Sequence, residues 1–378
     1  MKWECELDNC ITTTQHLKQY TNLPQDVESQ LNKIIHRHPM KITPYYISLI
    51  DWDNPNDPIK KMSVPSTNEL NLAGSYDTSG ELNNTVLPGV QHKYQQTALI
   101  LATNRCATYC RHCFRKRLIG TSDKEILKRF EDAVNYINKH KEINNVLITG
   151  GDPFVLSNNV IYSMLDLLTK ITHLSFIRFG TRTLVTLPSR FDDEEFLEIL
   201  NTFNKNKKRT YVVTQFNYPR EITSQAKKAI NSLIKNGILI NNQTVLLKGV
   251  NDYPKTLAKL LNKLVRIGVN PYYVFQCRPV KRVKNQFQIP LYKGIEITET
   301  AKQDCNGLSK RFKYIMSHKS GKIEILGVFE NKILFKYHQA KEPKNLGKIF
   351  TRPFNKNAKW FDDLKRPRSI NFNKENHT

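Results

Sequence analysis

Two hydrophobic periods alternate along the chain from about residue 97 onward. Six short runs rich in β-branched and aromatic residues are typical of strands, at residues 97–103, 144–151, 176–185, 209–216, 238–247 and 271–277. The stretches between them carry apolar residues three and four positions apart, as amphipathic helices do, at residues 123–140, 159–171, 192–205, 224–236 and 254–268. This alternation predicts an α/β fold with a parallel sheet, because parallel neighbours need long crossover connections.

The number of units predicts the shape of the sheet. Right-handed crossovers let six strand–helix units curl into a partial (β/α)6 TIM-like barrel whose strand C-termini open on one rim. We expect residues 89–299 to form this barrel and residues 1–88, with a helix at 26–37, to form an N-terminal extension. Residues 300–378 hold a predicted hairpin at 322–338 and a basic tail, KRPRSINFNKENHT, which we expect to lack fixed structure.

The charge and the cysteine content limit the possible cellular compartments and binding partners of the protein. The formal net charge of +24 favours contact with nucleic acid, acidic proteins or anionic metabolites, although solvated lysines on outer helix faces would account for it equally well. No apolar run approaches the roughly 20 residues that span a bilayer, and MKWECELDNC lacks the features of a signal peptide. Seven cysteines, an odd number, do not suggest a disulfide framework, so we expect reduced thiols and a cytoplasmic protein.

Three of the cysteines form a C-x3-C-x2-C loop directly after the first predicted strand: Cys106, Cys110 and Cys113. A structural zinc site needs four closed ligands, and no further pair stands at finger spacing, although His112 lies inside the loop. Three thiolates can instead hold three irons of a [4Fe-4S] cluster and leave the fourth iron open to an external ligand. S-adenosylmethionine needs such a vacancy for its reductive cleavage to a radical.

A block of cations surrounds these thiols. Arg111, Arg115, Lys116 and Arg117 can lower the thiolate pKa values, offset the charge of a cluster or receive a carboxylate. GGDPF follows the second predicted strand and QCRP follows the sixth, so three unusual segments fall on one rim.

The cysteine loop resembles that of the radical S-adenosylmethionine (SAM) superfamily, whose usual core is a six-unit partial barrel. The segment ITGGDPF is similar to the superfamily's glycine-glycine-acid motif. That likeness implies that Gly150 and Gly151 let the backbone approach the methionine moiety and that Asp152 meets its ammonium group. On its own, a GGD sequence is usually a turn.

Longer stretches, from about residue 42 to residue 296, resemble the lysine 2,3-aminomutase family. The segments include ITPYYISLIDWDNPNDPIKKMSVP, LPGVQHKY, TQFNYPREIT and KGIEI. This family combines the radical with pyridoxal 5'-phosphate to move an amino group between neighbouring carbons. The resemblance implies an isomerase, an amino-acid 2,3-aminomutase that takes a small-molecule amino acid and electrons from an external donor of the flavodoxin or ferredoxin type.

In that family a lysine in a glycine-rich segment after KGIEI holds pyridoxal phosphate as an imine. Lys322 matches this lysine and Gly321 the last glycine, but SHKSG replaces most of the other glycines. The role requires a site that depresses the amine pKa, whereas an ordinary exposed hairpin lysine is the alternative.

The resemblance also implies phosphate-binding residues. Lys93 and Tyr94 match a basic-aromatic pair, Thr97 replaces the next arginine of the family, and Gln243 is a further candidate.

The substrate residues depart from the lysine-specific pattern. Arg115 matches the arginine that engages the substrate carboxylate, although it could merely balance cluster charge. Lysine-specific members hold the distant ammonium with two aspartates, and those positions are Arg278 and Ile315 here. An arginine repels an ammonium, typically by several kcal/mol in a dry pocket. Free lysine is therefore disfavoured, and an acidic amino acid such as glutamate suits Arg278 and its basic neighbours Lys281, Arg282 and Lys284, unless this loop points to solvent.

An alternative keeps the radical but drops pyridoxal phosphate, with an acidic macromolecular partner, such as a translation factor that presents a lysine, as the substrate. The family's C-terminal cysteine-rich segment, associated with zinc and subunit contacts, has no counterpart in this chain. Its absence leaves homo-oligomerisation open.

Overall fold

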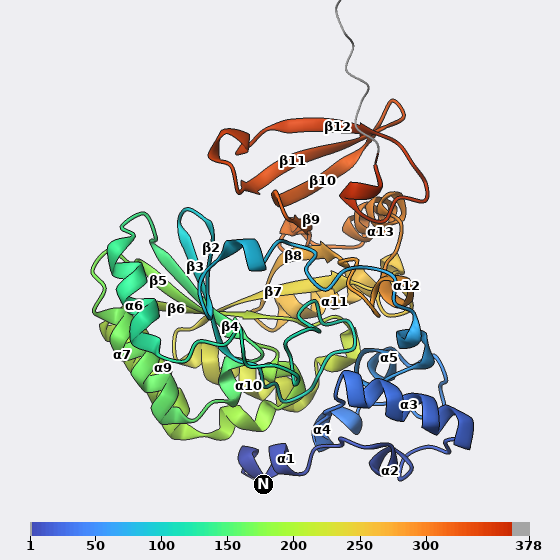
Figure 1. Ribbon diagram of the computed structural model, residues 1–378, viewed down its shortest axis with the longest axis horizontal. Helices are drawn as coiled ribbons and strands as arrows, with labels where there is room; N and C mark the ends of the chain where they lie inside the picture. The colour runs from blue at the N-terminus through green and yellow to red at the C-terminus, as the bar shows by residue number, and fades with distance from the viewer. Residues whose placement is uncertain (1, 365–378) are drawn as a thin grey trace, which may run out of the picture.

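A computed structural model describes residues 2–364 (Figure 1). Its strands form one sheet in chain order: β1 (Thr85–Leu87), β2 (Val90–Tyr94), β3 (Thr97–Thr103), β4 (Asn145–Gly150), β5 (Phe176–Gly180), β6 (Arg209–Thr214), β7 (Leu239–Leu246), β8 (Asn270–Gln276), β9 (Lys313–His318), β10 (Gly321–Phe329), β11 (Lys332–Ala340) and β12 (Ile349–Pro353). The helices are α1 (Trp3–Asp8), α2 (Thr14–Leu17), α3 (Gln25–Arg37), α4 (Pro44–Ile47), α5 (Pro58–Ser63), α6 (Phe130–Lys139), α7 (Asn158–Thr169), α8 (Thr183–Thr186), α9 (Glu194–Asn206), α10 (Ser224–Lys235), α11 (Pro254–Arg266), α12 (Lys284–Phe287) and α13 (Leu291–Gln303).

The predicted partial barrel is present. The six predicted strands are β3 to β8, which pair in parallel, and the five predicted helices are α6, α7, α9, α10 and α11. The sheet order runs from β1 to β12, and within the described residues no pairing joins its two ends. The fold is therefore an open α/β barrel, as predicted.

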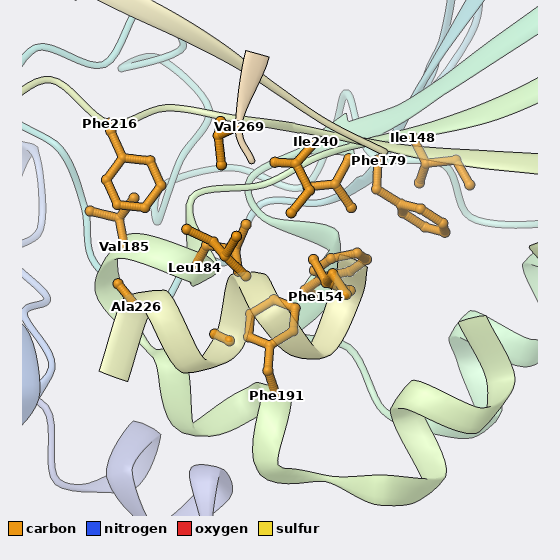
Figure 2. Close-up of a cluster of buried hydrophobic side chains, with 14 of the residues drawn as sticks. Ile148, Phe154, Phe179, Leu184, Val185, Phe191, Phe216, Ala226, Ile240 and Val269 are labelled. Carbon is orange, nitrogen blue, oxygen red and sulfur yellow. The ribbon is translucent and has the colours of Figure 1, made fainter. Parts of the chain in front are cut away.

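Side chains alternate between the two faces of the barrel strands. Ile148 and Phe179 are register partners that face the helices, where they pack with Phe154, Leu184 and other buried side chains (Figure 2). The rings of Phe154 and Phe179 lie 5.0 Å apart. Each such side chain contributes roughly 1.5–3 kcal/mol when it is fully buried. The next register pair, Leu147 and Arg178, points the other way, into the barrel.

Two predicted elements have clearly different bounds, and four strands were not predicted: β1, β2, β9 and β12. The third predicted strand ends at Gly180, because the Asp152 carboxylate accepts bonds from Thr181 Oγ1 and Arg182 N and draws the chain away. Helix α6 begins at Phe130, seven residues late, because Leu127 N donates to Leu101 O at the end of β3. After α13 the chain adds β9, a seventh parallel strand that the fading hydrophobic rhythm did not predict.

The segments outside the barrel pack beside it (Figure 1). In the N-terminal extension, the predicted helix is α3, and Tyr109 N donates to Lys41 O while Arg111 N donates to Met62 O. At the other side β10 and β11 form the predicted hairpin, which β9 joins to the barrel. The three-part division of the chain stays a prediction, and the predicted basic tail lies outside the described residues. Among those residues, no helix combines the length and apolarity needed to cross a bilayer.

Candidate active site

A cavity of about 340 Å³ lies inside the barrel and brings the predicted site residues together. All twelve line it, from the cysteine loop and the ends of β4 and β8 to β2, β7 and β10: Lys93, Tyr94, Cys106, Cys110, Cys113, Arg115, Gly150, Gly151, Asp152, Gln243, Arg278 and Lys322. Their roles stay predictions, but their shared location is a fact of the structure. The cavity has a cysteine end and a lysine end.

At the cysteine end, three free thiols face the cavity, and burial dominates the pKa values of two of them. Burial raises the pKa of Cys113 to about 11, and it raises that of Cys106 together with the nearby Asp152 and thiols. Arg115 and Lys116 do lower the pKa of Cys113, but burial outweighs them. In the metal-free protein the cation block therefore lowers the pKa of Cys113 by less than burial raises it.

The reason is that acidic residues neutralise the cations. Glu69 is fully buried and binds Arg111 at 2.6 Å and Lys116 at 2.8 Å. Glu81 binds Arg115 at 3.1 Å and Arg117 at 2.8 Å. Both acids come from the irregular segment before β1, where sequence patterns gave no signal.

This donor set fits a cluster of several irons better than one zinc ion. A bound cation would displace the thiol protons and supply the missing positive charge. Among the described residues, the one group of three metal-ligating side chains whose ligand atoms all lie within 4.8 Å is His92, His140 and Glu142, which includes no cysteine of the loop. The three sulfurs are therefore not all within 4.8 Å of one another, which is too far apart for them to bind one tetrahedral zinc ion together.

The two glycines after β4 are required by close packing against the cysteine loop. A Cβ on Gly150, whose φ is +119°, would lie 2.4 Å from Thr103 O, and one on Gly151 would lie 2.1 Å from Arg105 O. Their neighbour Asp152 is buried and accepts bonds from Thr181 Oγ1, Arg182 N and Phe154 N. Burial raises its pKa even though these bonds lower it. The motif therefore joins the cysteine loop to β4 and β5.

Lys322 lines the lysine end and does not lie on the outside of the hairpin. Its Nζ lies 5.7 Å from the ring centre of Tyr94 and 5.0 Å from that of Tyr273, and no acid pairs with it among the described residues. Burial and the nearby cations Arg178, Lys93 and Arg278 lower its pKa to about 7. The amine is therefore poised to be neutral near physiological pH, as attack on a carbonyl carbon requires.

Gly321 and Lys93 fix the surroundings of this amine. A Cβ on Gly321 would lie 2.2 Å from Gln339 O on β11, so glycine is needed where the hairpin approaches most closely. Lys93 Nζ donates to His318 O at 2.6 Å and to Ser79 O at 3.2 Å. Burial, followed by Arg278, lowers the pKa of Lys93 to about 7.

The two arginines predicted to meet substrate differ in their partners. Arg115 is committed to Glu81 and also donates to Gly150 O at 3.3 Å. Arg278 lies 4.0 Å from the ring centre of Phe114 and donates to two neutral groups, Ser79 Oγ at 2.8 Å and Ser317 Oγ at 3.0 Å. The cavity lining does not include Ile315 or the three basic residues that were predicted to assist Arg278, which are Lys281, Arg282 and Lys284.

Sequence reasoning missed several cavity residues: Ser79, Glu81, Arg178, Arg182 and Ser317. The residue nearest to a predicted ligand is Arg182, whose Nη1 lies 3.0 Å from Cys110 Sγ. The rule that functional residues follow strand ends would have found it, but the third strand was predicted to run through to residue 185. The serines and Glu81 lack any sequence signal of this kind.

Comparison with known proteins agrees with this geometry. The model of the Radical SAM superfamily matches residues 100–261. Over 349 residues, 92% of this chain and 93% of the relative, the sequence is 42% identical to a putative L-lysine 2,3-aminomutase of Aquifex aeolicus (strain VF5). The chain belongs to the lysine 2,3-aminomutase family of radical SAM enzymes. The predicted resemblance and the predicted isomerase class are thereby confirmed.

Other members of the lysine 2,3-aminomutase family differ in their named substrates. The L-lysine 2,3-aminomutase of Clostridium subterminale is 37% identical over 81% of this chain and 73% of its own length. The glutamate 2,3-aminomutase of Clostridioides difficile (strain 630) is 36% identical over 82% of this chain and 72% of its own. A solved radical SAM methyltransferase of Sphaerobacter thermophilus aligns with a TM-score of 0.36 at 12% identity, over 60% of this chain and 68% of that chain.

Proposed function

We propose that the protein is an amino-acid 2,3-aminomutase that uses a [4Fe-4S] cluster, S-adenosylmethionine and pyridoxal phosphate, and that it prefers an acidic amino acid such as glutamate to lysine. One observation carries the proposal. An amine with a pKa of about 7, Lys322, faces the same cavity as the three free thiols Cys106, Cys110 and Cys113. A radical SAM enzyme without pyridoxal phosphate has no need of such an amine.

The residues of the cysteine end suit the first two cofactors. Cys106, Cys110 and Cys113 would hold three irons, and the backbone at Gly150 and Gly151 would line the place of the methionine moiety. When bound, the cluster and S-adenosylmethionine supply the 5'-deoxyadenosyl radical, and pyridoxal phosphate supplies a ring that delocalises an unpaired electron. The chain's own contribution is to hold them in one enclosed space that excludes water.

The lysine end suits the phosphate-bearing cofactor. Lys322 offers a neutral amine for covalent attachment, and the rings of Tyr94 and Tyr273 flank it. Lys93 and Arg178 are cations near it, and both bond only to neutral acceptors. An unpaired buried cation is costly, and a dianionic phosphate would satisfy both.

Arg278 carries the substrate preference. Its guanidinium is buried, lies over the ring of Phe114 and donates to two serine hydroxyls; burial lowers its pKa, the nearby Glu81 raises it, and no salt bridge joins it to an acid among the described residues. A carboxylate could bond to it in two parallel hydrogen bonds, whereas an ammonium would meet repulsion from Arg278 and Lys93 together. The same repulsion disfavours a protein-borne lysine. The external electron donor and a cytoplasmic location stay predictions.

The test of pyridoxal phosphate use is spectroscopic. We expect protein incubated with pyridoxal phosphate to show a visible absorption band that borohydride fixes covalently, and Lys322→Ala to abolish it. Lys319→Ala is the matched control, because Lys319 lies three residues away in the same β9–β10 region and its side chain is 67% exposed. Equal labelling of both variants, or no band in protein with a complete iron–sulfur cluster, would overturn this part of the proposal.

The test of the substrate is an anaerobic incubation of reconstituted enzyme with a reductant and glutamate, aspartate or lysine. Chromatography of the derivatised amino acids should detect a β-isomer of an acidic amino acid and at most a trace of β-lysine. Conversion of lysine at the higher kcat/KM would contradict the role given to Arg278.

A further inference from the structure

We propose that Arg182, held by Glu221, sets the reduction potential of the cluster bound by Cys106, Cys110 and Cys113. This inference rests on the proposed function, because it requires that the three thiols hold a cluster. It assigns a positioning and tuning role to two residues that the mechanism above does not use.

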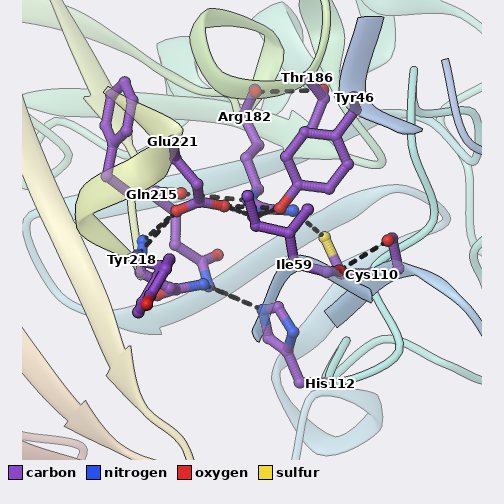
Figure 3. A network of polar contacts seen from close by, with 12 residues as sticks. Tyr46, Ile59, Cys110, His112, Arg182, Thr186, Gln215, Tyr218 and Glu221 are labelled. Carbon is purple, nitrogen blue, oxygen red and sulfur yellow. Dashed lines mark hydrogen bonds and ion pairs between the residues drawn. The ribbon is translucent and has the colours of Figure 1, made fainter. Parts of the chain in front are cut away.

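The geometry places a cation directly on one ligand sulfur (Figure 3). Arg182 Nη1 lies 3.0 Å from Cys110 Sγ. Arg182 is 9% exposed, so water screens this contact little. No other guanidinium donates to a sulfur of the loop among the described residues. Cys110 is thus singled out from the other two thiols.

A buried network prevents the guanidinium from moving away. Its Nη2 donates to Tyr46 Oη at 2.8 Å and forms an ion pair with Glu221, and its Nε donates to Gln215 O at 3.1 Å. The guanidinium carbon of Arg182 lies 5.2 Å from the ring centre of Tyr46. Every nitrogen of the guanidinium therefore has a fixed partner, and the one aimed into the cavity meets sulfur.

Glu221 is itself fixed in position. Its carboxylate is fully buried and accepts bonds from Tyr46 Oη at 2.6 Å, Asn217 N at 2.6 Å and Tyr218 N at 2.9 Å. Burial lowers the pKa of Arg182, but the Cys110 thiolate, Tyr46 and Glu221 raise it more, so the residue stays a cation. The pair acts as a fixed dipole whose positive end touches the sulfur.

The backbone of Arg182 links this pair to the glycine-glycine-acid motif. Arg182 N donates to Asp152 Oδ2 at 2.6 Å, and Thr181 Oγ1 donates to Asp152 Oδ1 at 2.6 Å. One residue therefore touches the cysteine loop through its side chain and the end of β4 through its backbone. This makes the Arg182–sulfur distance a property of the barrel rather than of a mobile loop.

The physical effect has a definite sign. Reduction adds one negative charge to a cluster, and a cation hydrogen-bonded to a ligand sulfur stabilises that charge. Arg182 therefore raises the potential, and Glu221, as the negative end of the pair, lowers it. Removing the two charges one at a time should move the potential in opposite directions, which damage to the fold would not do.

The experiment is a redox titration of the reconstituted protein, monitored by electron paramagnetic resonance without S-adenosylmethionine. We expect Arg182→Gln to lower the ratio of reduced to oxidised cluster about tenfold at a fixed ambient potential, which equals about 59 mV for a one-electron couple. Arg182→Lys should keep most of the effect of the native residue. Glu221→Gln should raise the ratio.

Controls separate this role from others. Arg190→Gln removes another buried arginine, which pairs with Asp193 at 2.6 Å and touches no thiol, and it should leave the potential unchanged.

An unchanged potential in Arg182→Gln, or shifts of the same sign in Arg182→Gln and Glu221→Gln, would overturn the inference. Arg182→Gln would also leave this potential unchanged if Arg182 served only to bind the carboxylate of S-adenosylmethionine. Wild-type protein without a cluster signal would instead refute the proposed function. If Arg182→Gln does not hold a cluster, Glu221→Gln and Arg182→Lys still decide the matter.

Discussion

The two ends of the cavity both contain buried cations, but only one end neutralises them. At the cysteine end Arg111 and Lys116 share Glu69, and Arg182 pairs with Glu221. At the lysine end Arg178 and Arg278 bond only to neutral groups, and the amines of Lys93 and Lys322 have no acidic partner among the described residues. Charges that are paired inside the protein hold its loops in place. Charges left unpaired are available to an anion that arrives from outside.

The pKa values express the same contrast. Although burial opposes it, Arg111 and Lys116 lower the pKa of Glu69 to about 2, so this carboxylate at the cysteine end is ionised, while burial and Arg111 lower the pKa of its partner Lys116 only to about 8. At the lysine end burial lowers the pKa values of Lys93 and Lys322 to about 7. A high positive charge at one site therefore says little about function until its partners are known.

The largest expected effect concerns the paired end. Glu69→Gln leaves Arg111 and Lys116 buried without their counter-charge, which should lower the free energy of unfolding by about 3–5 kcal/mol. Urea denaturation followed by circular dichroism measures it.

Glu299→Gln is the matched control for this change. Glu299 pairs with Lys302 on the surface of α13, with its side chain 53% exposed, and its loss should cost less than about 1 kcal/mol. If Glu69→Gln lowered the free energy of unfolding by as little, the ion pairs at the cysteine end would not stabilise the fold.

A smaller effect should mark the unpaired end. Arg278→Gln removes a charged donor that we assign to substrate, and such hydrogen bonds are worth about 1.5–3 kcal/mol. We expect KM for glutamate to rise roughly 10- to 100-fold with little change in kcat, measured by anaerobic steady-state kinetics. Lys281→Gln, a neighbour that does not line the cavity, should behave as wild type. Loss of kcat at unchanged KM would contradict this role.

The smallest effect, taken per pH unit, is a pH dependence of stability. The pKa of Lys322 is about 7 in the folded protein and 10.5 ordinarily, so between these values the unfolded chain binds a proton that the folded chain releases. Stability of the cofactor-free protein should therefore rise with pH across this window, by at most about 1.4 kcal/mol per pH unit for each such lysine.

Lys322→Met should flatten this rise in urea unfolding at pH 7, 8 and 9, whereas Lys319→Met should not. An identical slope in Lys322→Met and wild type would show that the amine is not held neutral, and would weaken the contrast between the two ends.

The sequence predicted the site best where the functional residues lie close together along the chain or directly after a strand. The cysteine loop and the strand-end rule placed Cys106, Asp152 and Arg278 at one cavity, because parallel strands end at a common rim. The rule does not say which carboxylate meets which cation. Glu69 and Glu81 lie in a segment without periodicity, so their pairing depends on tertiary folding.

Two further misses have physical causes. Strand β9 escaped prediction because its six residues, Lys313–His318, follow a helix and a turn without the usual strand rhythm. Arg182 was hidden because hydrogen bonds to Asp152 end β5 early, and local propensity does not report a bond to a distant side chain.

The continuous sheet described above has a consequence for what the enzyme can accept. The cysteine loop leaves from β3, and Lys322 stands on β10, so strands of one hydrogen-bonded sheet carry both ends of the cavity. Neighbouring strands keep a nearly constant spacing of about 4.8 Å. The sheet therefore fixes the distance between the cysteine loop and the Lys322 amine, and under the proposed function this distance would limit the length of the molecules that can react between them.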